Sequence, residues 1–322
     1  MERILRRTVI PAKQAGRRLD QAAAELLADF SRSRLKVWIE RGDLTLSGRQ
    51  AEPKTRVREG EELALDVELE PVILVEPQAI PLVVVHEDEA CLVIDKPSNL
   101  VVHPGAGNPS NTLQNALLHL DPRLAAVPRA GIVHRLDKDT SGLLVVARTL
   151  DAHKVLVEKV ERRQIERVYE GICQRVLTGG GVVEAPIGRH PRDRVRMSVR
   201  EGGRPALTRY WVLERFRAHT HLRIQLTTGR THQIRVHCAH LRAPLVGDPL
   251  YGGRPRLPKS PEPRLREQLQ AFPRQALHAK RLAFQHPISS EELGFESALP
   301  EDMTELLHAL RADLTAAASG GQ

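Results

Sequence analysis

The 322-residue sequence predicts an α+β fold, with a small N-terminal module followed by a larger domain on a mixed, largely antiparallel sheet. Residues 1–67 carry two stretches of helical spacing before short alternating strands. Residues 68–81 contain three prolines, spaced too closely for a helix, which predicts an extended linker. Residues 82–311 carry many strand patterns without the regular strand–helix alternation of a parallel sheet, which predicts the mixed topology.

The N-terminal module is expected to contain two short helices and then strands. Apolar side chains recur at helical spacing from Leu19 to Phe30. A second helix is expected to begin at Ser31 or Ser33, either of which can cap it, and to end at Gly42. Alternating apolar residues after Gly42 predict two short strands.

Basic side chains lie off the apolar stripes of this module, among them Arg17, Arg18, Arg34 and Lys36. From these positions alone, a role in solubility and a role in binding RNA are equally open. The stretch RRLDQAAAELLADFSRSRLKVWIERGDLTLSGR resembles the alpha-L RNA-binding motif, a two-helix module shared by a small-subunit ribosomal protein and several RNA-modifying enzymes. That resemblance implies that these four side chains contact RNA.

The larger domain is expected to begin with strands. LVVVHED and ACLVIDKP predict two buried strands, and GLLVVART, ERVYEGIC, ALTRYWVLER, THLRIQLTTG and QALHAKRLAFQHP predict further ones. Helices are predicted at TLQNALLHL, AHKVLVEKVERRQ, THQIRVHCAHL and PEDMTELLHAL, with Thr231 as the cap of the third. Residues 312–322, rich in Ala, Ser and Gly, are predicted to be a disordered tail.

The charge distribution favours a polyanionic partner. The net charge is +8, and 39 of the 48 basic side chains are arginines, whose planar fork suits phosphate oxygens and base edges. Residues 129–258 carry 25 basic and 12 acidic side chains, so this block holds the whole excess. A solvated face and a biased genome composition are the alternatives, but a concentrated basic block is typical of a nucleic-acid surface.

Other sequence features bear on where the protein works. No apolar run approaches the roughly 18 residues of a membrane span, and the start MERILRRTVIP lacks the apolar stretch of a secretory signal. The three cysteines are few and far apart, which argues against a disulfide framework. A cytoplasmic protein that is not in a membrane is therefore expected.

Two polar clusters are candidates for chemistry. The first is the loop from Gly131 to Gly142, which contains Asp137 and precedes a strand. A turn capped by its own side chains, with Asp137 paired to an arginine, is the structural alternative. The second cluster, residues 228–240, contains histidines and a cysteine. A zinc site there is disfavoured, because no carboxylate lies at a helpful spacing and arginines would repel the ion.

Three motifs occur in a recognisable order: HRLDKDTSG, then ERVYEG, then TGRTHQIRVH. Together they resemble the RluA-type family of RNA pseudouridine synthases. DKPSNLVVHPGAGNP, GGGVVEAPIGRHP, HLRAPLVGDPLYGGRP and RQALHAKRL are also similar, particularly to the RluD branch, which acts on large-subunit ribosomal RNA. The resemblance extends to about Leu310. Asn99 stands where many members have glycine, and asparagine tolerates the left-handed backbone of such a turn.

The resemblance implies an isomerisation in which the N1–C1′ bond of a uridine breaks and the uracil is reattached through C5. Asp137 matches the aspartate that either attacks C1′ or removes the C2′ proton, and the sequence does not choose between these routes. Arg235 matches the arginine that pairs with it. Tyr169 matches the tyrosine that packs on the uracil, and its hydroxyl is a candidate for removing the C5 proton. Arg135 matches a residue that fills the space of the flipped base.

The resemblance also implies the partners. Ribosomal RNA is the expected substrate, either free or within an assembling large subunit, and the expected state is a monomer. No cofactor and no metal are expected, because the isomerisation needs no redox partner or group donor. Further RNA contacts are expected from Arg189, Arg192, Arg194 and Arg230. The alternatives are a non-catalytic RNA-binding or ribosome-assembly factor, and a metal-dependent nuclease or deaminase using His232, His237 and Cys238.

Overall fold

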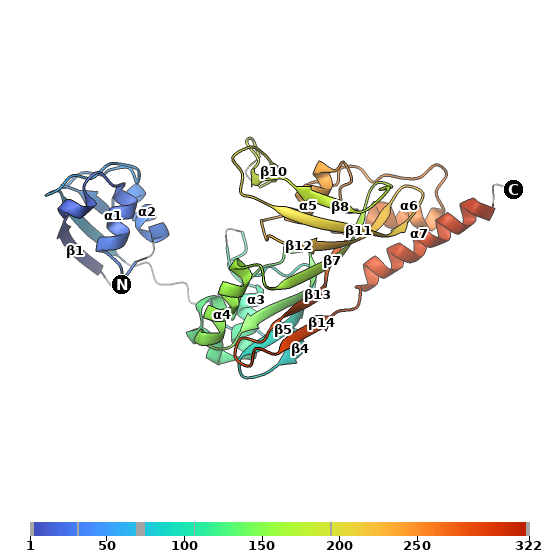
Figure 1. Cartoon of the computed structure of the whole chain (residues 1–322), viewed down its shortest axis with the longest axis horizontal. Coiled ribbons are helices and arrows are strands. Elements are labelled where there is room, and N and C mark those ends of the chain that lie inside the picture. Colours follow the sequence, from blue (N-terminus) through green and yellow to red (C-terminus); the bar gives the residue numbers. More distant parts are fainter. Residues whose placement is uncertain (1–2, 31, 69–74, 106, 194, 320–322) are drawn as a thin grey trace. The chain divides into compact units, whose positions relative to one another are not determined.

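The computed structural model describes residues 3–30, 32–68, 75–105, 107–193 and 195–319. The chain divides between Leu74 and Val75 into two compact units (Figure 1). Residues 69–74 of the predicted linker lie outside the described residues. Val75 and Ile80 pack against the core of the second unit, which therefore begins earlier than the predicted residue 82.

The first unit contains a three-stranded antiparallel sheet in the order β1 (Arg3–Val9), β3 (Glu62–Glu68), β2 (Leu44–Leu46). Strand β1 was not predicted, because RILRRTV does not alternate apolar with polar residues. It pairs with β3 along its whole length, from Arg3 opposite Glu68 to Val9 opposite Glu62. Backbone pairing with a neighbouring strand therefore decides this element.

Two helices complete the first unit: α1 (Leu19–Leu26) and α2 (Arg32–Arg41). Ser31 lies outside the described residues, and the helix that follows it ends one residue before Gly42, as predicted. The helices bury their apolar stripes in one core, which includes Leu19, Ala22, Ala23, Leu35 and Ile39. Because one face of each helix is buried, the apolar spacing in the sequence predicted both helices.

The second unit contains a nine-stranded mixed sheet within the described residues, in the order β4-β5-β6-β13-β7-β12-β11-β8, with β14 paired to β13. Among the strands that the structure describes, only β13 and β6 pair in parallel, so the sheet is largely antiparallel, as predicted. The strands are β4 (Val83–Glu87), β5 (Cys91–Lys96), β6 (Ser141–Ala147), β7 (Glu166–Cys173), β8 (Gly181–Glu184), β11 (Leu207–Arg215), β12 (Thr220–Leu226), β13 (Leu277–Gln285) and β14 (Glu292–Glu296).

The first of these strands corrects one prediction. Strand β5 is buried as expected, but β4 is not, since Val83 is 64% exposed and Val85 is 39% exposed. Strand β4 is at the edge of the sheet, with β5 as its one neighbour. An apolar run therefore predicted the strand but not its position in the sheet.

The helices of the second unit are α3 (Leu113–Leu120), α4 (Leu150–Glu161), α5 (Gln233–His240), α6 (Pro263–Ala271) and α7 (Glu301–Ser319). Helices α6 and α7 lie side by side (Figure 1) and share an apolar cluster that includes Leu269 and Leu306. No described helix combines the length and the apolar character needed to cross a bilayer.

The predicted disordered tail is wrong for residues 312–319, which continue helix α7. Alanine favours the helix more than any other residue. The helix is also tied down by Asp313, which is buried and accepts hydrogen bonds from Arg217 and from the backbone amide of Glu262. Residues 320–322 lie outside the described residues.

Candidate active site

A cleft of about 430 Å³ in the second unit collects the three predicted catalytic side chains, Asp137, Tyr169 and Arg235. Asp137 lies in the loop before β6, Tyr169 lies on β7, and Arg235 lies on α5. Asp137 and Arg235 are 98 residues apart in the sequence. The volume is within the range of ligand-binding pockets, and only the folded sheet brings the three residues together.

The loop of Asp137 is held by its own turn and by the neighbouring strand β13. The backbone amide of Thr140 donates to the carbonyl of Asp137 at 3.1 Å, and the Thr140 hydroxyl accepts from Gln275 at 3.0 Å. Gly142 has φ of +111°, and a Cβ there would lie 2.3 Å from the carbonyl oxygen of Ala279. A glycine is therefore required where β6 meets β13.

Lys96 also holds the loop of Asp137 in place. It is fully buried, and its ammonium donates to the carbonyls of Pro97, Leu100 and Lys138 at 2.7 to 3.0 Å. Burial lowers the pKa of Lys96 to about 7. Asn99 between these acceptors has φ of +62°, as expected for the residue that replaces glycine in this turn.

Arg235 lies between two carboxylates. One Nη donates to Asp137 at 3.1 Å, and the Nε and the other Nη donate to Asp248 at 2.8 and 2.9 Å. Burial opposes the charge of Arg235, but the hydrogen bonds and charges of Asp248 and Asp137 raise its pKa above the usual value. The predicted ion pair between Arg235 and Asp137 is present. Arg235 is also paired with the buried side chain of Asp248.

The start of α5 differs from the prediction. Its N-cap is His232, with a left-handed φ of 56°, and no side chain caps it. Thr231 is therefore not the cap. The side chain of Gln233 instead connects the helix to the preceding loop, because its carbonyl oxygen accepts from the Arg230 amide at 3.0 Å and from the Thr228 hydroxyl at 2.8 Å.

Tyr169 presents its ring to the cleft and is 5% exposed. Burial raises the pKa of its hydroxyl; the charge of Arg167 opposes that rise and the charge of Asp137 adds to it. The phenol is therefore protonated at neutral pH. This state favours packing by the ring over proton removal by the hydroxyl.

Two of the predicted RNA contacts line the same cleft. Arg135 is exposed there, and Arg230 is half-buried, with its Nε donating to the carbonyl of Pro205 at 3.1 Å. Arg189 and Arg192 do not line the cleft. They are exposed on a separate hairpin formed by β9 (Ile187–Arg189) and β10 (Met197–Val199). Arg194 of this hairpin lies outside the described residues.

Tyr251 connects that hairpin to the cleft. Its hydroxyl accepts from the Met197 amide at 2.8 Å and lies 2.9 Å from a ring nitrogen of His232. The guanidinium carbons of Arg196 and Arg235 each lie 5.2 Å from the centre of its ring. One aromatic ring therefore contacts both Arg235 and the arginine-rich hairpin.

The predicted contacts of the first unit take part in local interactions. Arg17 pairs with Glu25 at 2.6 Å, Arg18 pairs with Asp20 at 3.0 Å, and Lys36 lies 3.6 Å from Glu40. The guanidinium carbon of Arg34 lies 5.0 Å from the ring centre of Trp38. All four side chains retain exposed surface, so their contact with RNA stays a prediction.

Sequence reasoning missed several residues of the cleft and its support. Asp248 and Tyr251 were not singled out, although both lie in the quoted stretch HLRAPLVGDPLYGGRP. Arg167 was also missed, although it lies two residues before Tyr169 in ERVYEG and lines the cleft. A charged residue on the same face of a buried strand as a functional residue is the signal that could have found it.

The side chains of residues 228–240 are not arranged as the ligands of a zinc site. Both ring nitrogens of His237 are hydrogen-bonded, one to the Thr208 hydroxyl at 2.8 Å and one to the carbonyl of Ala185 at 3.0 Å. Cys238 is buried, and burial raises the pKa of its thiol well above the usual value. His237 and Cys238 are therefore engaged in hydrogen bonding and packing inside the second unit.

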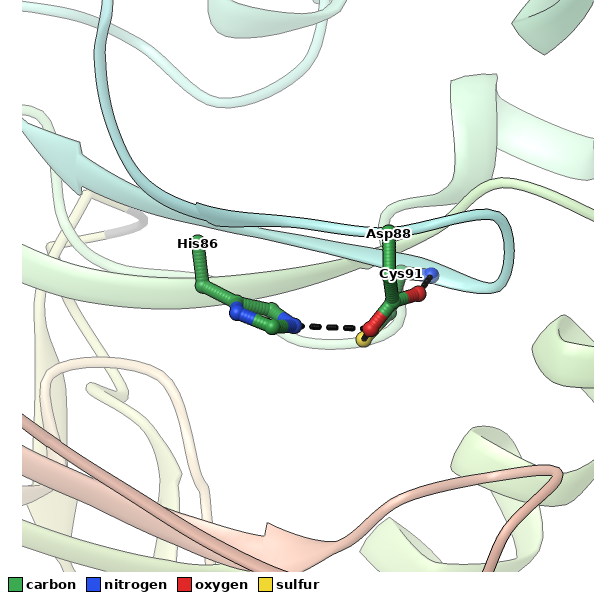
Figure 2. Close-up of side chains that lie close together, drawn as sticks. All are labelled: His86, Asp88 and Cys91. Carbon is green, nitrogen blue, oxygen red and sulfur yellow. Dashed lines mark hydrogen bonds and ion pairs between the residues drawn. The ribbon is translucent and has the colours of Figure 1, made fainter.

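In the described part of the chain, one group of possible metal ligands is compact: His86, Asp88 and Cys91 at the β4–β5 turn (Figure 2). The hydrogen bonds of Asp88 stabilise the β4–β5 turn. One oxygen of Asp88 accepts from the amides of Ala90 and Cys91 at 2.7 and 2.8 Å, and the other lies 2.7 Å from the His86 ring. Burial raises the pKa of the Cys91 thiol to about 12, so this thiol is not poised to bind a cation.

Known proteins resemble this chain over nearly its whole length. The model of the RNA pseudouridylate synthase family matches residues 90–240. The chain is 55% identical over 314 residues to "Ribosomal large subunit pseudouridine synthase D" of Xanthomonas campestris pv. campestris, covering 98% of this chain and 95% of that protein. It is 51% identical over 313 residues to the protein of the same name from Escherichia coli K12, covering 97% and 96%.

Solved structures agree with the fold. Human RNA Pseudouridylate Synthase Domain Containing 4 superposes with a TM-score of 0.55 at 28% identity, over 71% of this chain and 92% of that one. Human RNA Pseudouridylate Synthase Domain Containing 1 superposes with a TM-score of 0.53 at 24% identity, over 76% and 98%. With full-length relatives above half identity, and the family's motifs gathered in one cleft, this chain belongs to the RNA pseudouridine synthase family, as a member of its RluD-like branch.

Proposed function

We propose that this protein converts specific uridines of large-subunit ribosomal RNA to pseudouridine, with Asp137 as the catalytic carboxylate. The observation that carries the proposal is the ion pair of Asp137 with Arg235 inside a cleft lined by further arginines. The names of its full-length relatives support large-subunit ribosomal RNA as the substrate. An ionised carboxylate in a positively charged cleft suits chemistry on an RNA sugar.

Asp137 begins the reaction by one of two routes. Its carboxylate attacks C1′, forming an oxygen–carbon bond as the N1–C1′ bond breaks, or it removes the C2′ proton, forming a C1′–C2′ double bond as the same bond breaks. The uracil then turns and bonds to C1′ through C5. In the first route this bond displaces the carboxylate from C1′, and in the second the Asp137 carboxylic acid returns its proton to C2′. The C5 proton is then lost while N1 gains one. Arg235 orients Asp137, and the ring of Tyr169 packs on the uracil.

The remaining basic side chains hold the RNA. The uridine must leave its stack to reach Asp137, and Arg135, exposed at the cleft, is suited to filling the space left behind. Arg230 at the cleft and Arg189 and Arg192 on the hairpin add contacts to the backbone. The first unit, with its four partly exposed basic residues, serves as a separate docking surface.

The proposed function also includes the oligomeric state, the partner and the compartment. The protein acts as a monomer on ribosomal RNA, either free or in an assembling large subunit, and needs no cofactor. It works in the cytoplasm, a placement supported by three cysteines that are buried and free.

Tritium release from ribosomal RNA labelled at C5 of uridine tests the proposal, together with base-resolution mapping of pseudouridine in a strain lacking the gene. Release should occur, should resist a chelator, and should match uridines whose modification disappears in the strain. Tight binding of ribosomal RNA with no release at any uridine would instead identify a non-catalytic assembly factor. Cleavage or deamination of the RNA that the chelator abolishes, without release of tritium, would support the metal-dependent alternative.

A further inference from the structure

Arg167 is an unusual arginine among the described residues. Three arginines there are buried: Arg167, Arg235 and Arg274. Arg235 pairs with Asp137 and Asp248, and Arg274 pairs with Asp302 at 2.6 Å. Arg167 is 8% exposed, its Nε has no hydrogen-bond partner, and no described carboxylate pairs with it. A buried charge without a partner is unfavourable unless a ligand completes it.

The unpaired guanidinium faces the active-site cleft. Arg167 lies two residues before Tyr169 on β7, so the two side chains share a face of the sheet, and both line the cleft. One of its Nη atoms lies 2.9 Å from the position that a Cβ on Gly229 would take. The absence of a side chain at Gly229 therefore leaves room for the guanidinium at the wall of the cleft.

A second unpaired donor belongs to His134, a residue that also lines the cleft. His134 is 9% exposed, and its Nε2 accepts a hydrogen bond from the Val145 amide at 3.1 Å. Burial lowers the pKa of His134 to about 3, so the ring is neutral and its proton is on Nδ1. That Nδ1 is buried and has no partner among the described residues. Arg167 and His134 thus offer donors and no acceptor.

We propose that Arg167 and His134 form a subsite for a carbonyl oxygen of the uracil, and that this subsite stabilises the negative charge of the uracil during its detachment. The inference rests on the proposed function, but it does not depend on the route taken by Asp137. In both routes the electron pair of the N1–C1′ bond stays on N1. The resulting anion shares its charge with the carbonyl oxygens, which are acceptors for a guanidinium and an imidazole N–H.

The stability of an Arg167→Met variant separates this role from a structural one. Methionine retains the length of the side chain and removes a charge that has no partner in the free protein. The melting temperature of Arg167→Met should therefore equal or exceed that of the wild type. A lower melting temperature would show that Arg167 supports the fold, and would overturn the proposal.

Single-turnover rates test the chemistry. Arg167→Met should slow pseudouridine formation by about 100-fold or more, as expected for the loss of a donor to developing charge, and Arg167→Lys should recover part of the rate. The affinity for RNA and its dependence on salt should not change. Arg209→Met, at an exposed position on β11 outside the cleft, is the matched control and should react at the wild-type rate. An unchanged rate with a salt slope reduced by about 0.7 to 0.9 would identify a phosphate contact instead.

A leaving-group comparison tests the anion directly. Fluorine at C5 makes uracil more acidic, so detachment from 5-fluorouridine RNA depends less on external stabilisation. The slowing of N1–C1′ cleavage by Arg167→Met, and by the milder Arg167→Lys, should therefore be smaller for 5-fluorouridine than for uridine. Equal slowing of both substrates would overturn the proposal.

The charge of Arg167 lowers the pKa of Tyr169, against the rise that burial causes. An effect of Arg167 on the uracil must therefore be distinguished from an effect through the Tyr169 hydroxyl. Measured in a Tyr169→Phe background, Arg167→Met should slow the reaction by a similar factor, because its target is the uracil. If Arg167→Met no longer slowed the reaction in that background, Arg167 would act through the Tyr169 hydroxyl and not on the uracil, which would overturn the proposal. An inactive wild type would refute the proposed function, whereas an active wild type with an equally active Arg167→Met refutes the subsite alone.

Discussion

Asp248 holds the guanidinium of Arg235 by two parallel hydrogen bonds, of 2.8 and 2.9 Å, and leaves one Nη for Asp137 at 3.1 Å. The side chain of Asp248 is fully buried, and one of its oxygens also accepts from the amides of Leu250 and Tyr251 at 2.9 and 3.0 Å. The orientation of Asp137, the proposed catalytic carboxylate, therefore depends on a second carboxylate that does not line the cleft.

Asp248→Asn should reduce both stability and the rate of the chemical step. An amide cannot accept both hydrogen bonds from Arg235, and breaking a buried pair typically destabilises by about 3 to 5 kcal/mol. Melting curves and single-turnover rates of the folded fraction are the measurements. Asp313→Asn is the matched control, because Asp313 is equally buried but pairs with Arg217, and neither residue lines the cleft. It should lower the melting temperature and leave the rate unchanged; a rate loss as large as that of Asp248→Asn would contradict the positioning role.

Asp137→Asn should abolish turnover while RNA binding persists. The amide is nearly isosteric and leaves the arginines of the cleft in place, but it neither attacks C1′ nor removes a proton. Tritium release and a filter-binding titration on the same preparation separate the two effects. Arg235 keeps its pair with Asp248 in this variant, so the melting curve should show a folded protein. Release at the wild-type rate would exclude Asp137 as the catalytic carboxylate.

Tyr169→Phe should retain RNA binding and uracil detachment. Phenylalanine preserves the packing face, and burial already raises the pKa of the hydroxyl, so little phenolate is present at neutral pH. Product formation is expected to slow only if the hydroxyl takes the C5 proton. Single-turnover formation of pseudouridine, measured against loss of uridine, separates detachment from product formation. Equal turnover of the variant and the wild type would exclude the hydroxyl as a required base.

Stability should fall as the pH falls from about 6.5 to 4. Burial lowers the pKa of His134 to about 3 and those of His219 and His278 to about 4, against about 6.5 in an unfolded chain. The unfolded state therefore binds more protons in this window, and each histidine contributes up to about 1.4 kcal/mol per pH unit. The stability is fully present above pH 6.5 and is lost on acidification.

Urea unfolding at a series of pH values measures this effect as a slope. His219 is fully buried, and this burial lowers the pKa of its ring to about 4. The conservative variant His219→Gln should flatten the slope by about one proton. A stability that stays constant between pH 7 and pH 5 would show that these histidines titrate normally in the folded protein.

Removal of residues 1–74 should weaken binding to structured ribosomal RNA and flatten its salt dependence, while the second unit retains activity on saturating short RNA. Each lost phosphate contact removes about 0.7 to 0.9 from the slope of log affinity against log salt. The cleft lies entirely within the second compact unit, so its chemistry should persist. An unchanged slope for the folded, truncated protein would contradict a docking role for the first unit.

Local patterns in the sequence were reliable where a single face of an element is buried. Helices α1 and α4 were predicted because their apolar side chains recur with the period of the element. Patterns failed where a neighbour decides the structure. The polar strand β1 depends on pairing with β3, and residues 312–319 of α7 are helical although their composition suggested disorder.

By itself, the sequence determined the family and the α+β class. It also predicted Asp137, Tyr169 and Arg235 as site residues, because each of these three residues lies in a continuous motif. Only the tertiary structure decided how those residues meet. Strand β13 pairs with β6 on one side and β7 on the other, and this register places the loop of Asp137 beside the strand of Tyr169. The second anchor of Arg235 and the unpaired state of Arg167 also depend on which residues approach from distant segments. Periodicity reports whether a side chain is buried, but ion pairs and unmet hydrogen bonds depend on distances that only the folded sheet sets.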